Sequence, residues 1–512
     1  MTNNGGNGAA ADSQPHHHHE EIAKWEPNPD RLKSMHQRIT TPPKLLSQTA
    51  GHSSCCIFRA PTTFAGVNNK SYQPHIVSIG PYHRGKPHLA MIQEHKWRYL
   101  GSLLNRIPNL TLESLLSSIA PLESQIRAAY SEQIDLDRDE FLELMVLDGC
   151  FVVELFRKVA GVVEFEPHDP ILAMSWIMPF FYRDFLRLEN QIPFSVLESL
   201  FDSTRRGEEE KENIIHTHPA FSNTELQLSY KRKHSNHQNP HNSRKKYETR
   251  IDISLGSNSS NWALSLSALA LYFFNHSMQR PEEIVYKYRD LKGKHLLDLI
   301  RSSYTQFDPP PVRRSSDSPP THIIHSITKL RKAGIKLRRV DGGELDGSPL
   351  QVRFRRGVVE MPSITIDDFM SSFLVNAVAY EQCYSGGGGG GEWPMHFTAY
   401  ATLLDSLVNG FRDVEYLVDK DILENYLGTE AEVARFLNDL GKEVAFDIDE
   451  CYLAEVFGDV HRYYGSSWHF QWASFKFTYF QTPWSFISAL AALVLLVLTV
   501  LQTVYTIYGT YN

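Results

Sequence analysis

The chain has 512 residues, of which 42% are hydrophobic and 21% are charged, and its formal net charge at pH 7 is -8 with histidine neutral. This composition is typical of a globular protein, and the acidic balance argues against a nucleic-acid partner. The five cysteines form no CxxC pair and are too few to crosslink a chain of this length, so we expect a reducing compartment.

Residues 1–50 are rich in Gly, Asn, His and Pro and have little periodic apolar content. Such a segment cannot bury enough surface to repay the entropy of folding, and we predict a disordered N-terminal arm. The first thirty residues lack the continuous apolar region of a secretory signal. The histidines at 16–19 are interpreted as solvated low-complexity sequence, and no metal site is assigned to them.

Residues 51–201 are predicted to form the first helical part of a folded domain. Apolar residues recur there at spacings of three and four, which places them on one face of a helix. One predicted face consists of Phe141, Leu144, Met145, Asp148, Val152, Leu155 and Phe156. A second consists of Ile177, Phe180, Phe181, Asp184 and Leu188.

The periodic spacing of apolar residues ends over 202–260, which we predict to be a disordered charged insert. It contains basic clusters at 231–233 and 244–246. A solvated charge run is the favoured interpretation of these clusters, with a bipartite nuclear signal or a contact with anionic lipid as alternatives.

Residues 261–480 are predicted to hold the second helical part of the domain with a small β-hairpin. Helices are expected at 262–274 and 291–304, and a further one at 326–333 that ends at Gly334. Alternating residues at 335–337 and 352–354 predict short strands. Either Arg356-Gly357 or the glycine-rich turn at 341–343 would close the hairpin, with 358–366 as further extended chain.

The same part contains two predicted capping boxes. Thr365 with Asp368 is expected to begin a helix on which Asn376 faces inward, and Thr429 with Glu432 is expected to cap a helix at 431–440. Other helices are predicted at 397–408 and 414–426, and the glycine run at 386–391 ends the unit before them. An aromatic segment at 452–480 is expected to lie near a membrane surface.

The run 484–508 carries no charged residue and predicts a single C-terminal transmembrane helix. At about 1.5 Å per residue it spans roughly 37 Å, enough for a hydrocarbon core of about 30 Å with some tilt. The bulk of the chain is then expected in the cytosol, on either the plasma membrane or the endoplasmic reticulum, with a homo-oligomer through the helix as a modest expectation. The expected anchor residues are Trp484, Leu495, Leu498, Tyr505 and Tyr508.

Several polar residues stand out as a candidate structural cluster, namely His83, Arg84, His88, Asp148, Asp184, Glu189 and Asn190. His83, Arg84 and His88 precede a helix, where an anion or, with His95, a zinc ion would be the functional alternatives. Asp148 and Asp184 lie on predicted apolar helix faces, and a proton donor with a raised pKa is the functional alternative for them. We favour a structural role, in which the two carboxylates cap a helix or pair with Arg127 or Arg183.

The sequence provides no further catalytic motif. Cys150 lies inside a helical run, where thiols are usually buried and inert. The chain has neither a GxSxG elbow nor a GxGxxG loop. We therefore assign no catalytic residue, cofactor or metal.

Several long segments recur in the order of a known family, among them HIVSIGPYHRGKPHLAMIQEHKWRYL, MVLDGCFVVELF, DFLRLENQIPFSVLESL and SITIDDFMSSFLVNAVAYEQC. From about residue 57 to 508 the chain resembles the plant family called domain of unknown function 247. The resemblance implies a plant membrane protein without an established catalytic set. Some grass members are implicated as pollen-side determinants of self-incompatibility, which implies recognition rather than turnover. This chain departs from the usual pattern in its His-rich arm, its charged insert and its glycine run.

These observations together predict a mainly α-helical domain with a minor β-hairpin and one C-terminal transmembrane helix. The expected function is protein binding or signalling at a lipid bilayer, with an unknown protein partner. The alternatives are a membrane-bound hydrolase or transferase that uses Asp148, Asp184 or His83, and a passive structural membrane protein.

Overall fold

A computed structural model describes residues 28–41, 43–61, 71–217, 265–307, 324–340, 348–384, 395–445, 447–465 and 483–511. The chain divides into two compact units, Met1–Lys44 and Leu45–Asn512. The first unit contains one helix, α1 (Pro29–Thr40), within its described residues. The Asn28 side chain accepts hydrogen bonds from the first-turn amides of α1, and Pro29 occupies the first helical position. This helix lies within the region 1–50 that is predicted as a disordered arm, and it buries none of its residues.

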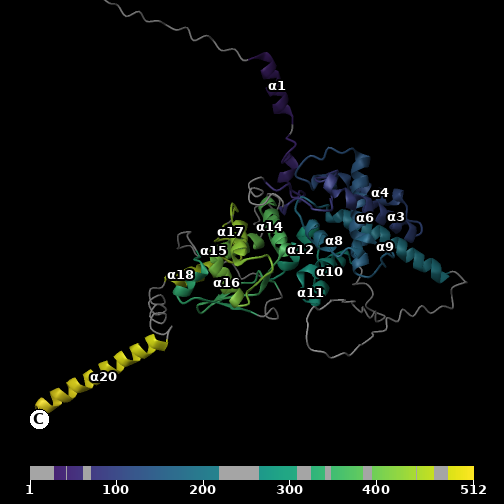
Figure 1. Cartoon of the computed structure of the whole chain (residues 1–512). Coiled ribbons are helices and arrows are strands. Elements are labelled where there is room, and N and C mark those ends of the chain that lie inside the picture. The colour runs from purple at the N-terminus through teal and green to yellow at the C-terminus, as the bar shows by residue number, and fades with distance from the viewer. Residues whose placement is uncertain are drawn as a thin grey trace, which may run out of the picture. The chain divides into compact units, whose positions relative to one another are not determined.

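The second unit is mainly helical, which confirms the predicted fold class (Figure 1). Its first half contains α3 (Ala90–Arg106), α4 (Leu112–Ile119), α5 (Glu123–Ala128), α6 (Arg138–Val159), α7 (Pro170–Ala173), α8 (Ile177–Asp184), α9 (Phe194–Thr217), α10 (Leu266–Met278), α11 (Glu282–Lys287) and α12 (Leu296–Tyr304). Short 3-10 helices lie at Gln48–Gly51, Pro87–Leu89 and Ala120–Leu122. Helix α9 continues past residue 201, where the sequence predicts the charged insert to begin.

The second half of this unit contains α13 (Ile327–Lys332), α14 (Asp368–Cys383), α15 (His396–Leu407), α16 (Phe411–Asp419), α17 (Glu430–Leu440) and α18 (Ala454–Gly465). Its strands are β1 (Lys336–Arg339), β2 (Arg353–Arg355), β3 (Val358–Met361), β4 (Ile364–Ile366) and β5 (Leu423–Asn425). The last helix is α20 (Pro483–Tyr511).

Helix α6 is the central element of the first half, and it packs against α3, α4, α9 and α10. The sequence predicts one apolar face on this helix. In the structure almost every residue from Leu144 to Lys158 is buried, so the helix is enclosed on all sides. Gly149 permits the close approach of α9, because a Cβ there would lie 2.5 Å from Leu200 Cδ1.

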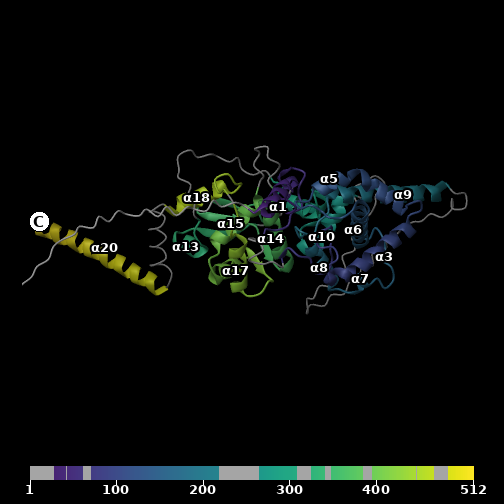
Figure 2. The ribbon, with the colours of Figure 1, turned by 90° about the horizontal axis from the view of Figure 1, so that it is seen from above.

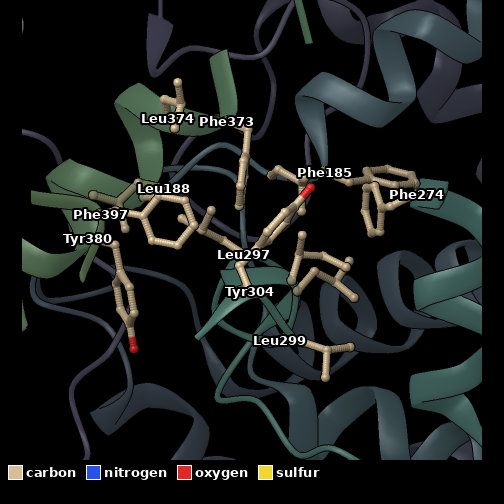
Figure 3. Close-up of a cluster of buried hydrophobic side chains, with 14 of the residues drawn as sticks. Phe185, Leu188, Phe274, Leu297, Leu299, Tyr304, Phe373, Leu374, Tyr380 and Phe397 are labelled. Atoms are coloured by element: carbon tan, nitrogen blue, oxygen red, sulfur yellow. The ribbon is translucent and has the colours of Figure 1, made fainter. Parts of the chain in front are cut away.

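The two halves share one continuous hydrophobic core. Figures 1 and 2 show α3, α4, α6 and α9 at one end and α15, α17 and α18 at the other, with α8, α12 and α14 between them. Where the halves meet, the rings of Tyr304, Phe373 and Phe397 pack with centroids 5.4–6.0 Å apart. Figure 3 shows Leu188 and Leu297 beside these rings, so side chains of both halves fill the same space.

The strands form two small sheets. In the three-stranded sheet of order β1-β3-β2, β2 and β3 are antiparallel and β1 runs parallel to β3. Arg356 and Gly357 join β2 to β3 with positive φ angles of 49° and 80°, so one of the two predicted turns closes the hairpin. The alternative turn at 341–343 lies outside the described residues. Strands β4 and β5 form a separate parallel pair that the sequence analysis does not predict.

Three predicted helix ends can be compared with the structure. Thr429 and Glu432 form the expected capping box at α17. The box expected from Thr365 is wrong, because Thr365 belongs to β4 and the Asp367 side chain caps α14 by accepting from Met370 N. The helix expected over 414–426 ends at Asp419, since Asp421 has a φ of 55° that breaks the helix before β5.

Other predicted features lie outside the described residues. They are the histidines at 16–19, the basic clusters at 231–233 and 244–246, the glycine run at 386–391 and most of the aromatic segment at 452–480.

Helix α20 contains one segment, Ile487–Tyr508, that is long and apolar enough to cross a bilayer. Its mean hydropathy is 2.4 and none of it is buried against the rest of the chain. The predicted residues Trp484, Leu495, Leu498, Tyr505 and Tyr508 are all exposed along this helix. Water-soluble folds usually bury an apolar helix face of this length.

His295 begins α12 and is held as the neutral imidazole. Its Nδ1 accepts a hydrogen bond from Asp298 N at 3.2 Å, and its Nε2 donates to Cys56 O at 2.9 Å. A proton on Nδ1 would meet the Asp298 N–H instead of a lone pair. The ring is completely buried, and its removal from water lowers the pKa of His295 to about 4.

We predict that this histidine makes the protein acid-sensitive. The unfolded chain binds a proton at His295 near pH 6.5 and the folded chain only near pH 4, so this group removes about 3 kcal/mol of stability as the pH falls across that interval. Urea unfolding of the wild type and of H295Q between pH 7 and pH 4 measures the effect. The variant should lose less stability than the wild type over this range, and parallel curves would contradict the assignment.

Candidate functional site

Most of the predicted polar residues surround residues 75–80, a segment without regular secondary structure that is exposed at His75 and buried from Ile76 onward, and which we call the buried segment. Asp184, the last residue of α8, binds the start of this segment. Its carboxylate accepts from the backbone N–H groups of His75 at 2.9 Å, Ile76 at 2.8 Å and Val77 at 3.2 Å, and from Arg187 Nε at 3.0 Å. Burial alone would raise the pKa of Asp184, but these hydrogen bonds and the Arg187 charge hold it below the usual value.

Asn190 binds the middle of the same segment in the manner of a neighbouring strand. Its Oδ1 accepts from Ile79 N at 2.7 Å, and its Nδ2 donates to Val77 O at 3.0 Å and to Asp184 O at 2.9 Å. The side chain thus satisfies backbone groups on both segments that no sheet partner reaches.

Asp148, in the centre of α6, binds the end of the segment. Its Oδ2 accepts from Gly80 N at 2.8 Å, and its Oδ1 lies 2.5 Å from Lys96 Nζ. Lys96 also donates to Ser78 O. Both charged groups are almost completely buried. Burial raises the pKa of Asp148, and the Lys96 charge and the Gly80 hydrogen bond oppose that rise.

Glu189 and His83 form the outer edge of this arrangement. Glu189 Oε1 accepts from Ala60 N at 3.0 Å, while its Oε2 lies 3.1 Å from His83 Nε2 and 3.6 Å from Arg59 Nη1. Burial lowers the pKa of His83, which favours the neutral ring.

The remaining two predicted residues lie apart from this group. Arg84 is exposed, 3.8 Å from the equally exposed Glu140. His88 Nε2 lies 3.3 Å from Pro74 O, where it supports the approach to the buried segment. Among the described residues, no three His, Cys, Asp or Glu side chains are grouped as metal ligands, and His83, His88 and His95 each have different neighbours.

We call the set His83, Lys96, Asp148, Asp184, Arg187, Glu189 and Asn190 the polar lattice. The expected ion-pair partners of its aspartates are wrong, since Arg127 pairs with Glu123 and Arg183 with Asp368. Two signals in the sequence indicate that Lys96 and Arg187 are candidate partners, although spacing alone does not pair Lys96 with Asp148. Lys96 follows Ile92 by four residues on an otherwise apolar helix face, and Arg187 follows Asp184 by three.

The carboxylates of the polar lattice bind groups of the same chain. All three are acceptors for backbone amides and for cations, and none of them lines the groove described below. Cys150 is fully buried, which raises the pKa of its thiol to about 12 and suppresses the thiolate.

A groove of about 500 Å³ lies beside the polar lattice, where the two halves meet. One wall comes from the residues around His75 and Arg183, and the other comes from α14 and α17. The groove has an apolar floor of Val375, Val378, Ala379, Phe436, Leu440 and Val444. Its rim carries both charges, from Arg183, Arg435 and Lys442 and from Asp368, Glu432, Asp439 and Glu443.

Asn376, buried on α14 next to the groove residue Val375, joins α14 to segments of the first half. Its Oδ1 accepts from Leu188 N at 2.8 Å, and its Nδ2 donates to Ser71 O at 3.0 Å. The sequence analysis predicts that Asn376 faces inward but does not predict the groove. The lining residues come from distant segments, and no spacing along the chain relates them.

The fold and the site define a mainly α-helical protein with a polar lattice in its first half, a groove where its halves meet and an apolar C-terminal helix. Residues 57–498 match the family model DUF247, described as a plant protein of unknown function. The chain belongs to this family, as the sequence resemblance predicts.

Two relatives from Arabidopsis thaliana cover most of the chain. The UPF0481 protein At3g47200 is 32% identical in an alignment of 470 residues that covers 88% of this chain and 85% of the relative. The putative UPF0481 protein At3g02645 is 24% identical over 481 residues, 85% and 87% of the two chains. No solved structure matches this chain.

We predict that D148N destabilises the protein by about 3–5 kcal/mol, because Lys96 then remains buried without a counter-charge. Chemical denaturation measures this change. The matched control is E143Q, the same type of substitution on the exposed side of α6, which should change stability by less than about 0.5 kcal/mol. Equal stability of the two variants would contradict the structural role of Asp148 and favour the acid–base alternative.

We also predict different effects of alanine at two glycines with the same backbone conformation. Gly80 and Gly85 have φ angles of 78° and 77°, so alanine costs about 1–2 kcal/mol at either position. At Gly80 the new Cβ would also lie 2.5 Å from Gln191 O, whereas nothing lies within 4 Å at Gly85. G80A should therefore lose about 1–3 kcal/mol more than G85A in the same unfolding assay. Equal losses would show that the buried segment is not held tightly.

Proposed function

We propose that this chain is a membrane-anchored protein-binding module, with its folded domain in the cytosol and without catalytic turnover. The observation that carries the proposal is the exposed apolar segment Ile487–Tyr508 of α20, attached to a domain whose buried aspartates Asp148 and Asp184 bind groups of the same chain. At about 1.5 Å per residue this segment is about 33 Å long, which suits a hydrocarbon core of about 30 Å. Trp484, Tyr505 and Tyr508 then lie toward its ends, as interfacial aromatics do.

The groove supports the binding part of the proposal. Its volume of about 500 Å³ is in the usual range of binding sites, and it lies at the junction of two halves, where such sites are common. An apolar floor between rims of both charges suits a polypeptide, which offers apolar side chains together with amides and charged groups. We propose that a segment of a partner protein binds there.

The anchor is tested by carbonate extraction of plant microsomes that contain the full chain. The wild type should stay in the pellet, and L495D/L498D should be released, because two aspartates near the middle of the segment cost about 5–7 kcal/mol of insertion. L112D/L172D makes the same change at exposed leucines of α4 and α7 and should stay in the pellet. Release of the intact wild type would overturn the anchor. The side of the membrane is tested with sealed microsomes: protease added outside should digest the folded domain if it is cytosolic.

The groove is tested by photo-crosslinking in the same microsomes. A crosslinking amino acid at position 371, in the groove, should give one discrete protein adduct, and the same group at position 415, exposed on α16, should not. R435E should reduce the adduct about tenfold, equivalent to about 1.4 kcal/mol, whereas R412E should leave it unchanged. Equal adducts from both positions, or no effect of R435E, would contradict binding in the groove.

A further inference from the structure

The three-stranded sheet presents one strongly basic face. The register places Lys336 of β1 and Arg355 of β2 on either side of Val358, and it places Arg338 and Arg353 on either side of Glu360. Residues directly opposite one another in a sheet project to the same side, and so do alternate residues of one strand. These four basic residues therefore share a face, which we call the basic sheet face: Lys336, Arg338, Arg353 and Arg355.

The basic sheet face is turned toward solvent, whereas the opposite face joins the core. All four basic residues are exposed, while Leu337 and Val359 between them are buried. From strand geometry, the four positions occupy the corners of a rectangle of about 10 Å by about 7 Å. They form a compact two-dimensional array of cations.

The positive charge of this face is largely unbalanced. Arg338 pairs with Glu360 across the strands. Among the described residues, no carboxylate lies within ion-pair distance of Lys336, Arg353 or Arg355, and Arg356 adds a further exposed cation in the hairpin turn. Over 329–360 the sequence has nine basic and four acidic residues, a net charge of +5 in a chain whose total is -8. Such local excess favours an anionic partner.

The sheet lies next to the helix that leads toward α20. Helix α18 packs on β2, and the Phe354 and Tyr463 rings meet with their centroids 5.8 Å apart. Helix α18 ends at Gly465 and α20 begins at Pro483, so the intervening chain can separate the two ends by at most about 60 Å. That intervening sequence is rich in aromatic residues and contains Lys476 as its one charged residue. The basic sheet face is consequently tethered within reach of any bilayer that holds α20.

We propose that the basic sheet face binds the anionic headgroups of the bilayer in which α20 is anchored, so that the domain has a second contact with the membrane. This inference rests on the proposed anchor. Arginine is suited to the role because its guanidinium group binds phosphate oxygens in pairs, and the cytosolic leaflet is the anionic one. The tether and the acidic charge of the whole chain favour lipid over nucleic acid as the partner.

The test uses the full chain carrying L495D/L498D, so that insertion of α20 does not hide a reversible contact. Flotation is measured with vesicles of phosphatidylcholine alone and with vesicles that also contain phosphatidylserine. We expect binding only to the phosphatidylserine vesicles, weakened by added salt. Adding K336Q/R353Q/R355Q should weaken this binding about 100-fold, since each basic residue near an anionic surface contributes about a fivefold factor.

The matched control adds R31Q/K33Q/R38Q instead, which removes the same charge from exposed positions of α1 and should leave binding within about twofold. Equal losses in the two triple variants would overturn the proposal, because the contact would then depend on total charge. Absence of binding to phosphatidylserine vesicles together with salt-sensitive binding to transfer RNA would also overturn it, by assigning the face to nucleic acid. Failure of the anchor alone is recognised separately, as carbonate release of the chain with an intact α20.

Discussion

The structure depends on the need to satisfy the backbone of a buried segment that no strand accompanies. The amides of residues 76, 77, 79 and 80 lie in the interior and that of the exposed His75 lies beside them, and an unpaired buried N–H costs about 1–3 kcal/mol. Asp184, Asn190 and Asp148 accept all five of them. These acceptors come from two helices and a helix junction, so a single irregular segment fixes how those elements meet. The cost is the free energy of removing the charged groups of the acceptors from water.

The same arrangement positions the groove. Residues just before the buried segment form one wall, and Arg187, which binds Asp184, also donates to Ser71 O at that wall. Asn376 then joins α14 to both Ser71 and Leu188. The groove is thus built on polar contacts that cross the junction of the halves. In the binding role proposed above, a groove supported in this way would be arranged before a partner arrives, which reduces the entropy lost on association.

The sequence predicts the parts of the fold that depend on local periodicity. The helical class, the hairpin at Arg356-Gly357, the cap at Thr429 and the apolar helix at the C-terminal side all follow from spacing and turn chemistry. The pairing of Asp148 with Lys96, the parallel β4–β5 pair and the groove do not, because their members are distant in sequence. Spacing reveals that a carboxylate lies on an apolar face, but only tertiary packing selects which cation meets it.

The enclosure of α6 on every side has a consequence for biosynthesis. Along the stretch that is buried on every side, this helix has no face suited to water. It therefore stays prone to aggregation until α3, α4, α9 and α10 have all packed around it. Helix α10 leaves the ribosome about a hundred residues after α6, at a synthesis rate of about 5–20 residues per second. For several seconds the nascent chain therefore exposes a hydrophobic helix. A chaperone that covers this helix during the delay would determine how much of the protein escapes aggregation.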